Sequence, residues 1–487
     1  MAASNQGDQR LVGARLSALI GAHFLGSAEV GPLPYLGKMS DSFAAESVPS
    51  AEPEQHAPEI EDGTPLTPDE AMYARLTISF RRLAARQNEI MRLARYVKER
   101  AEEIDDAKLR AKQLIEQRLT EIDEHAIEEL MDSFLPFVRD SIDDENLSEE
   151  ERDEAVSKAL TEIVGSLPDG AISSYLESVI RVAGSPPAVP MLYSSLVVSL
   201  VGELETLVGE ITRALYEHDP IKLEDSERQF KWSEIAAFGT LDEFRAHAIE
   251  RAVEAMLHGS FSDWLGFLQT KFDVKAPRLA AEFEAIEIVQ RRHAIVHAGG
   301  LASRQYLDKL SKFKELDVAL EDELEVTFEY LARAADVLLV VALGLVSSAG
   351  FKVCKQDEIV EAFEDAIANR CFFLLQERRF GAVKMIVEQV PRDRMKSESS
   401  RLIIQVNGWI AMKALGEFEK CIKEVKAFDV SARSNDMVLA KLTLLGEIKP
   451  AYALARKMVD SGDLKQEHWL TWPLLEDLRE HHRKLTA

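Results

Sequence analysis

The residues most suited to chemistry lie in one short stretch, 289–300, which reads VQRRHAIVHAGG. His293 and His297 are four positions apart, so a helix would place both imidazoles on one face, one turn apart. An arginine guanidinium grips phosphate oxygens at two points, and histidine transfers protons near neutral pH. Arg292 beside these imidazoles therefore predicts cleavage of a phosphodiester. With RNA, the 2′-hydroxyl can serve as the nucleophile, and no metal is needed.

Two arrangements could bring Arg292 and His297 together. Arg292 and His297 are five residues apart, which is about 140° on an ideal helix. They converge if the helix loosens before the glycine pair, or if a second copy of the helix packs against the first in a symmetric dimer. Arg291 is a candidate for binding the substrate. Its alternative role is a surface ion pair with Glu287, four residues earlier, which would contribute little.

Apolar stretches around this segment predict a bundle of four or five helices between residues 190 and 350. Thr240 is a suitable N-cap for one of these helices, and Gly259 is a suitable stop. The expected helices fall in 191–218, 240–259, 260–274, 277–300 and 324–350. No segment of the bundle has the pattern of a strand, so the expected fold class is all-α.

The residues from Arg292 to His297 (RHAIVH) resemble the R-[N/H/D]-x-x-x-H motif of the HEPN superfamily, the higher eukaryotic and prokaryotic nucleotide-binding domains. The resemblance covers residues 190–350. It implies a metal-independent endoribonuclease that works as a homodimer, in which Arg292 binds the scissile phosphate, His297 is the general acid/base and His293 supports the site. Members of the superfamily are frequent in toxin–antitoxin and antiphage systems, and others have lost activity and serve as binding modules.

Length and charge bound the class of protein. The chain has 487 residues and a net charge of −26, which argues against a chain-wide electrostatic hold on nucleic acid, although a local basic pocket can still bind phosphate. Three well-separated cysteines predict a reduced, cytoplasmic protein. No P-loop, dinucleotide motif or zinc-ligand spacing occurs, so neither a cofactor nor a metal is expected. The most apolar run, 337–346, is about half the length of a membrane span and predicts a buried helix.

Two regions precede the bundle. Residues 1–66 are expected to be flexible, because the Pro- and Glu-rich part from residue 26 onward cannot bury enough apolar area. The apolar stretch 11–25 lacks a convincing cleavage site for export, and Met39 is an alternative start. Residues 67–185 are expected to form a helical hairpin or coiled coil, with Thr67 as N-cap and Pro68 as the first helical residue. Within this region, the acidic run 140–154 is interpreted as a solvated loop and helix face.

Residues 351–487 predict short helical hairpins similar to tetratricopeptide repeats. The segments 414–425 (ALGEFEKCIKEV) and 444–455 (LLGEIKPAYALA) align through a shared Leu-Gly-Glu, and 377–390 is interpreted as a degenerate earlier copy. Arg378 and Arg379 in that copy are interpreted as capping a helix turn rather than contacting RNA. His481 and His482 are interpreted as solvated tail residues.

These features together predict a cytoplasmic endoribonuclease of HEPN type, a toxin or antiphage effector that cleaves RNA in a dimeric cleft. The expected partners are RNA, a second copy of the chain and a protein held by the C-terminal repeats; no membrane contact is expected. The alternative is a non-catalytic nucleotide-binding or interaction scaffold, favoured by the negative charge and by the lack of an obvious basic track for RNA. A positive pocket at Arg291, Arg292 and His297 would support the enzyme, and a buried, ion-paired arginine would support the scaffold.

Overall fold

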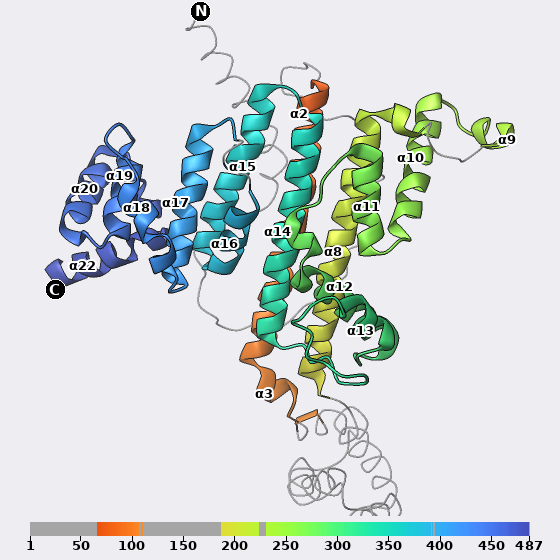
Figure 1. Cartoon of the computed structure of the whole chain (residues 1–487), viewed down its shortest axis with the longest axis horizontal. Coiled ribbons are helices and arrows are strands. Elements are labelled where there is room, and N and C mark those ends of the chain that lie inside the picture. Colours follow the sequence, from red (N-terminus) through yellow and green to blue (C-terminus); the bar gives the residue numbers. More distant parts are fainter. Residues whose placement is uncertain are drawn as a thin grey trace, which may run out of the picture. The chain divides into compact units, whose positions relative to one another are not determined.

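The computed structural model describes residues 66–106, 109–110, 187–223, 230–390, 392 and 395–486. Within these ranges the chain is all-α, as predicted, and the only β pairing is an isolated antiparallel bridge between Leu301 and Glu323. The expected flexible segment 1–66 (apart from its last residue), most of the hairpin 67–185 and the acidic run 140–154 lie outside the described residues. The α-helices, most of them labelled in Figure 1, are α2 (Pro68–Glu99), α3 (Ala101–Ile104), α8 (Ala188–His218), α9 (Trp232–Ile235), α10 (Leu241–Leu257), α11 (Phe261–Phe272), α12 (Phe283–Ala298), α13 (Arg304–Leu310), α14 (Phe328–Val353), α15 (Asp357–Gln376), α16 (Phe380–Gln389), α17 (Glu398–Ala414), α18 (Ile422–Ala427), α19 (Asn435–Leu444), α20 (Ile448–Ser461), α21 (Gln466–Thr471) and α22 (Glu476–Thr486). Short 3-10 turns occur at η1 (Pro220–Leu223), η2 (Arg278–Ala281), η4 (Phe418–Lys420) and η5 (Pro473–Leu475).

The described residues form two compact units that alternate along the sequence. The first unit contains residues 66–85, 202–286 and 336–486, and the second contains the described parts of 86–201 and 287–335. Helices α2, α8, α12 and α14 each carry the chain from one unit to the other. The units therefore cut across the contiguous ranges 190–350 and 351–487, whose status as separate domains stays a prediction.

Two helix starts predicted from the sequence are confirmed. The Thr67 hydroxyl accepts a hydrogen bond from the backbone N–H of Glu70 at 3.3 Å, and the Glu70 carboxylate accepts one from the backbone N–H of Thr67 at 2.9 Å. Pro68 is the first residue of α2. At the start of α10, the Thr240 hydroxyl accepts from the backbone N–H of Glu243 at 3.1 Å. Both caps satisfy N–H groups that have no partner within the helix.

Other helix starts are capped by carboxylates that lie far away in the sequence. Asp69 accepts from backbone N–H groups at the entry to α15, Asp105 from those of α8, and Glu364 from those of α17. The closest contact of each carboxylate is 2.6 to 2.7 Å. Because the partners come from distant parts of the chain, local sequence patterns give no sign of these caps.

Two of the described helices, α8 and α14, are long and strongly apolar. Both are long and apolar enough to cross a membrane by length and composition, which is weak grounds for a span, since core helices pass the same test. In the most apolar window of α14, 78% of the residues are buried within the chain. Close packing continues at Gly344, where an added Cβ would lie 2.6 Å from the ring of Pro277. This helix therefore has the environment of a core helix, as predicted for the run 337–346.

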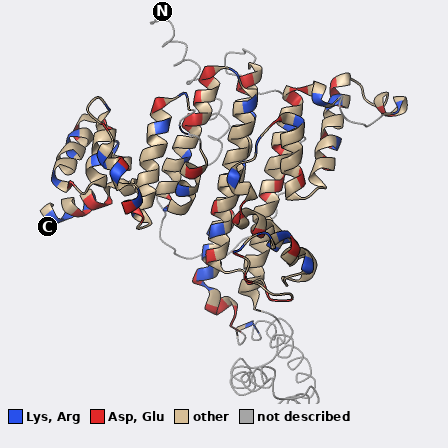
Figure 2. Cartoon of the chain, viewed as in Figure 1, with Lys and Arg blue, Asp and Glu red and all other residues tan. Residues whose placement is uncertain are grey.

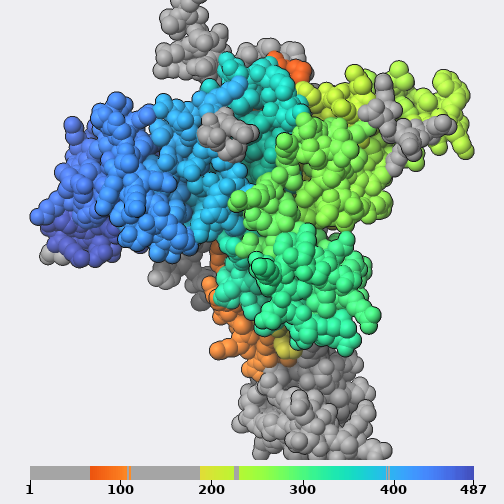
Figure 3. Space-filling model, viewed as in Figure 1, coloured from red at the N-terminus to blue at the C-terminus, as the bar shows by residue number. Residues whose placement is uncertain are grey.

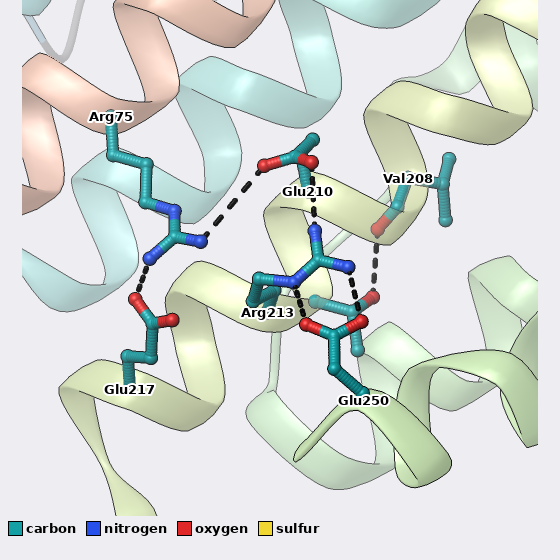
Figure 4. Close-up of polar contacts among 7 residues, drawn as sticks. Arg75, Val208, Glu210, Arg213, Glu217 and Glu250 are labelled. Carbon is teal, nitrogen blue, oxygen red and sulfur yellow. Dashed lines mark hydrogen bonds and ion pairs between the residues drawn. The ribbon is translucent and has the colours of Figure 1, made fainter. Parts of the chain in front are cut away.

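Ion pairs on α8 tie this helix to α2 and α10 within the first unit (Figure 4). Arg213 donates to Glu210 at 2.7 Å. It also donates through two nitrogens to the Glu250 carboxylate, and the hydrogen bond from Arg213 Nη2 to Glu250 Oε2 is 2.6 Å long. Arg75 pairs with Glu217 and lies 4.0 Å from Glu210. The hydrogen bonds from Arg213 hold the pKa of the Glu250 carboxyl below its ordinary value. All the cations of this network are neutralised inside the protein.

The C-terminal helices contain two equivalent turns at the segments that align in sequence. Gly416 follows α17 with a φ of 75°, and Gly446 follows α19 with a φ of 76°. In each turn the next residue, Glu417 or Glu447, donates its N–H to the carbonyl five residues earlier, at 2.8 and 2.9 Å. Glycine adopts a positive φ without steric cost, so the shared Leu-Gly-Glu is the sequence signature of this helix ending.

A third turn of the same kind occurs at the degenerate copy. Arg378 occupies the left-handed position with a φ of 58°, and Arg379 donates its N–H to the carbonyl of Leu374 at 2.9 Å. These arginines therefore shape the turn between α15 and α16, as interpreted from the sequence. Successive long helices α15, α17 and α19 pack side by side, and each pairs with the helix or turn that follows it. The described residues of 351–486 thus form a series of stacked helical hairpins, drawn in teal to blue in Figures 1 and 3.

Candidate functional site

The motif segment lies on α12, which remains an α-helix through Ala298. Gly299 and Gly300 follow with φ values of 63° and 87°, and Gly300 donates its N–H to the carbonyl of Ala294 at 3.1 Å. The predicted glycine stop is therefore present. Because the helix stays regular up to this stop, the route in which it loosens to bring Arg292 toward His297 is not observed.

The two histidines of α12 lie on one face, as predicted. The ring centroids of His293 and His297 are 4.5 Å apart, with an angle of 46° between the ring planes. His293 is half-buried and His297 is exposed. The last turns of α12 thus present one exposed imidazole, with a second, half-buried imidazole next to it.

Arg292 lies on a different side of α12 from His297. The regular helix keeps about 140° between the two positions. Arg292 is half-buried, and its Nε is shielded from solvent. Within a single copy, the structure therefore brings His293 and His297 together but does not bring Arg292 to His297.

Arg291 is part of an internal network in the second unit. Its Nε donates to the Glu287 carboxylate at 2.6 Å, and one of its terminal nitrogens donates to the backbone carbonyl of Glu325 at 2.6 Å. The Arg291 guanidinium also lies 4.3 Å from the ring centroid of Tyr330. The ion pair with Glu287, which was the alternative role given for Arg291, is present, but it does not lie on the surface. The two side chains are only 13% and 8% exposed.

The Glu287 carboxylate also holds two tyrosines that sequence reasoning missed. Tyr306 on α13 donates its hydroxyl to one oxygen at 2.7 Å, and Tyr330 on α14 donates to the other at 2.7 Å. Burial, reinforced by the nearby carboxylate, raises the pKa of both hydroxyls, so they remain donors. The Glu–Arg spacing of four was visible in the sequence, but the tyrosines lie 19 and 43 residues away from Glu287. Together these groups fix α12, α13 and the first turn of α14 to one another.

The chain after α12 is held by a short antiparallel contact with residues 321–324. Ala302 donates to the carbonyl of Asp322 at 2.8 Å and accepts from Glu321 at 2.9 Å, and Leu324 donates to the carbonyl of Gly300 at 2.9 Å. Glu321 has a φ of 70°, which is uncommon outside glycine. The segment that leads from His297 to α13 is therefore fixed by backbone hydrogen bonds.

The described residues contain no group of three or more His, Cys, Asp or Glu side chains that could hold a metal ion. All three cysteines are buried and unpaired, and burial raises the pKa of Cys354 and of Cys371 to about 12. These thiols are therefore unsuited to nucleophilic attack at neutral pH. The chemistry available in the described parts of the chain centres on α12.

The terminal histidines are less solvated than expected. His482 lies 2.6 Å from the Tyr452 hydroxyl through its Nδ1, and the His481 ring packs against the same tyrosine. Both are half-buried. The interpretation as a solvated tail was wrong, because α22 packs back onto α20 and places them against its surface.

No protein-family model, curated protein or solved structure matches this chain. The resemblance to the HEPN superfamily therefore depends on the residues from Arg292 to His297 and on their helical surroundings.

Proposed function

We propose that this protein is a metal-independent endoribonuclease of HEPN type that acts in the cytoplasm as a toxin or antiphage effector. The observation that carries the proposal is the placement of His297. It is exposed at the carboxyl end of a regular helix, with the His293 ring 4.5 Å away. An exposed imidazole can reach a bound strand and transfer protons to it.

Two copies of the chain build the active cleft in this proposal. Since one helix holds Arg292 and His297 on different sides, a second copy must supply the arginine that meets each His297. Val296 and Leu301 flank His297 and are 48% and 43% exposed. Large apolar side chains at such exposure favour a partner surface.

The reaction follows from the groups available. The RNA 2′-oxygen attacks the phosphorus and the bond to the 5′-oxygen breaks, which gives a 2′,3′-cyclic phosphate and a free 5′-hydroxyl. The 2′-hydroxyl loses a proton and the 5′-oxygen gains one, and His297 exchanges a proton with one of these oxygens as general acid/base. Arg292 binds the phosphate oxygens and offsets the charge that develops on them. His293 supports the orientation of the His297 ring.

Arg291 takes a different role from the substrate-binding one expected for it. Its Nε and one terminal nitrogen already donate within the protein, and the side chain is 13% exposed. We assign it to holding α12 in place. The phosphate contact then falls to Arg292.

The second candidate function is a non-catalytic scaffold that binds a nucleotide or a protein. The buried ion pair of Arg291 with Glu287 favours it, because a buried, paired arginine serves the fold. The stacked hairpins of residues 351–486 favour it as well, since such arrays present extended binding surfaces. In the enzyme these hairpins recruit a protein partner that controls or directs cleavage.

The test is degradation of single-stranded RNA in the presence of a chelator. We expect wild type to cleave, Arg292→Ala and His297→Ala to lose about 100-fold or more in rate, and the products to end in cyclic phosphate. Arg95→Ala and His218→Ala are matched controls at exposed positions away from α12. Equal activity in all five proteins, or none in wild type, would remove the enzyme and leave the scaffold.

A further inference from the structure

A group of exposed cations follows the candidate site along the chain. Arg304, Lys309, Lys312 and Lys314 are all exposed, and we call them the α13 surface. With Asp308 as the one acidic residue among positions 304–314, four cations minus one anion give a net charge of +3. Figure 2 marks these cations in blue, and the same segment lies on the surface seen in Figure 3. The chain as a whole carries a net charge of −26, so this segment is opposite to it in sign.

The cations of the α13 surface are not neutralised within the described part of the chain. Elsewhere in the second unit Lys98 pairs with Glu329 at 2.5 Å and Arg92 with Glu89 at 2.6 Å. None of the four α13 cations has such a contact with a described carboxylate, and Lys312 lies only over the ring of Phe313, 4.9 Å from its centroid. Their charge is therefore free to act on a ligand.

The α13 surface is held in a fixed position relative to α12. Ser303 caps α13 by accepting the N–H of Tyr306 at 3.2 Å. The buried Tyr306 hydroxyl then donates to Glu287 on α12 at 2.7 Å. These contacts anchor α13 to the first half of α12, and Arg304, the first residue of α13, follows His297 by seven positions along the chain.

We propose that the α13 surface binds the phosphate backbone of the single-stranded RNA that His297 cleaves. The proposal rests on the proposed function for the identity of the strand, and it names a substrate-binding surface that Arg291 does not provide. A row of unpaired cations attracts a polyanion without reading its sequence. Exposed apolar anchors, which a membrane surface would require, are absent from positions 304–314, where Tyr306 and Leu310 are buried.

An acidic segment follows this surface along the chain. Positions 315–325 contain six acidic residues and no cation: Glu315, Asp317, Glu321, Asp322, Glu323 and Glu325. Backbone hydrogen bonds hold its end against residues 300–302. Carboxylates there repel a phosphate chain, so removing them should strengthen the binding of a polyanion to the neighbouring cations of the α13 surface.

The experiment measures binding of a fluorescent single-stranded RNA to the full-length His297→Ala protein, in which the strand stays intact. Lys309→Gln/Lys312→Gln/Lys314→Gln should weaken binding at least tenfold and reduce the slope of log affinity against log salt by about 2, roughly 0.7 for each charge removed. Glu321→Gln/Glu323→Gln should tighten binding. Lys423→Gln/Lys449→Gln/Lys457→Gln, exposed cations of α18 and α20, are the matched control and should change neither quantity.

Unchanged RNA affinity and salt slope in the α13 variant would overturn the proposal. Binding to phosphatidylserine vesicles that needs the α13 lysines, with no RNA binding, would overturn it in favour of a membrane surface. The same experiments distinguish failure of the proposed α13 surface from failure of the proposed nuclease activity. RNA binding that depends on α13, without cleavage by wild type, would remove the enzyme alone. Cleavage that is indifferent to the α13 lysines would remove this surface alone.

Discussion

The ion-pair network on α8 in the first unit and the α13 surface in the second unit use arginine and lysine in opposite ways. Arg213 on α8 forms ion pairs with Glu210 and Glu250, and Arg75 on α2 forms one with Glu217. These charges therefore join helices to one another. On the α13 surface, Lys309 and its three companions are exposed without a carboxylate partner among the described residues. The same residue types therefore stabilise the fold in one place and remain available to a ligand in the other.

Helix α12 carries two adjacent arginines in different surroundings. Arg291 is buried in an ion pair with Glu287, and Arg292 is half-buried beside it. Ion pairing and burial, which depend on tertiary contacts, decide whether a charged side chain supports the fold. The comparison predicts large losses of stability where charges are paired and buried, and small ones where they are exposed.

The largest expected loss of stability comes from Glu287→Ala. Removing this carboxylate leaves the buried Arg291 without its counter-charge and two tyrosine hydroxyls without an acceptor, so the free energy of unfolding should fall by about 3–5 kcal/mol. Urea denaturation measures the change. Glu325→Ala is the control, because Arg291 uses only its backbone carbonyl. A loss below 1 kcal/mol would mean that the network does not support the fold.

A smaller loss is expected for Tyr330→Phe. The change deletes one hydrogen bond to a buried carboxylate and keeps the ring under Arg291, so the cost should be about 1.5–3 kcal/mol. The same denaturation experiment measures it. Tyr96→Phe is the control, since that tyrosine is exposed. Equal stability of the two variants would show that the Glu287 carboxylate tolerates the loss of this donor.

The ion pair between Arg213 and Glu250 should contribute about 1 kcal/mol to the free energy of unfolding, because the Glu250 side chain is about half exposed to solvent. The pKa of the Glu250 carboxyl lies below the ordinary 4.5. The stabilisation by this ion pair is therefore complete above that pH, and it disappears as the pH falls through the lowered pKa. We therefore expect Glu250→Gln to be less stable than wild type at pH 7 and to approach it in acid. A difference that grows as the pH falls would contradict the assigned contact.

The smallest change in stability is expected on the α13 surface. Lys309→Gln and Lys312→Gln should each alter the free energy of unfolding by no more than about 0.5 kcal/mol, because these side chains are exposed and unpaired. Thermal unfolding of the two variants beside wild type checks this. A loss above 1 kcal/mol in either would place the lysine in the fold and erase the contrast with Arg213.

Local signals predicted much of the fold. The Thr67 and Thr240 caps, the glycine stop after α12 and the Leu-Gly-Glu turns all follow from a few adjacent residues whose backbone needs are known. The caps by Asp69, Asp105 and Glu364 could not be predicted, because each joins residues far apart in the chain.

Local signals also predicted part of the candidate site. The spacing of His293 and His297 fixed their shared face once a helix formed. The burial of Arg291 depends on Tyr306 and Tyr330, which no local pattern connects to it. The cations of 304–314 were visible in the sequence, but their significance rests on the absence of partners among the described residues, which only a structure reveals.

The most direct test of the account mixes two inactive proteins. Arg292→Ala and His297→Ala are combined under conditions that allow subunits to exchange, and cleavage of single-stranded RNA is measured in chelator. If two copies share each site, mixed dimers contain one Arg292 and one His297 in the same cleft, and the mixture should regain about a quarter of wild-type activity. If both residues act within one copy, or if neither acts on RNA, the mixture will be as inactive as its components.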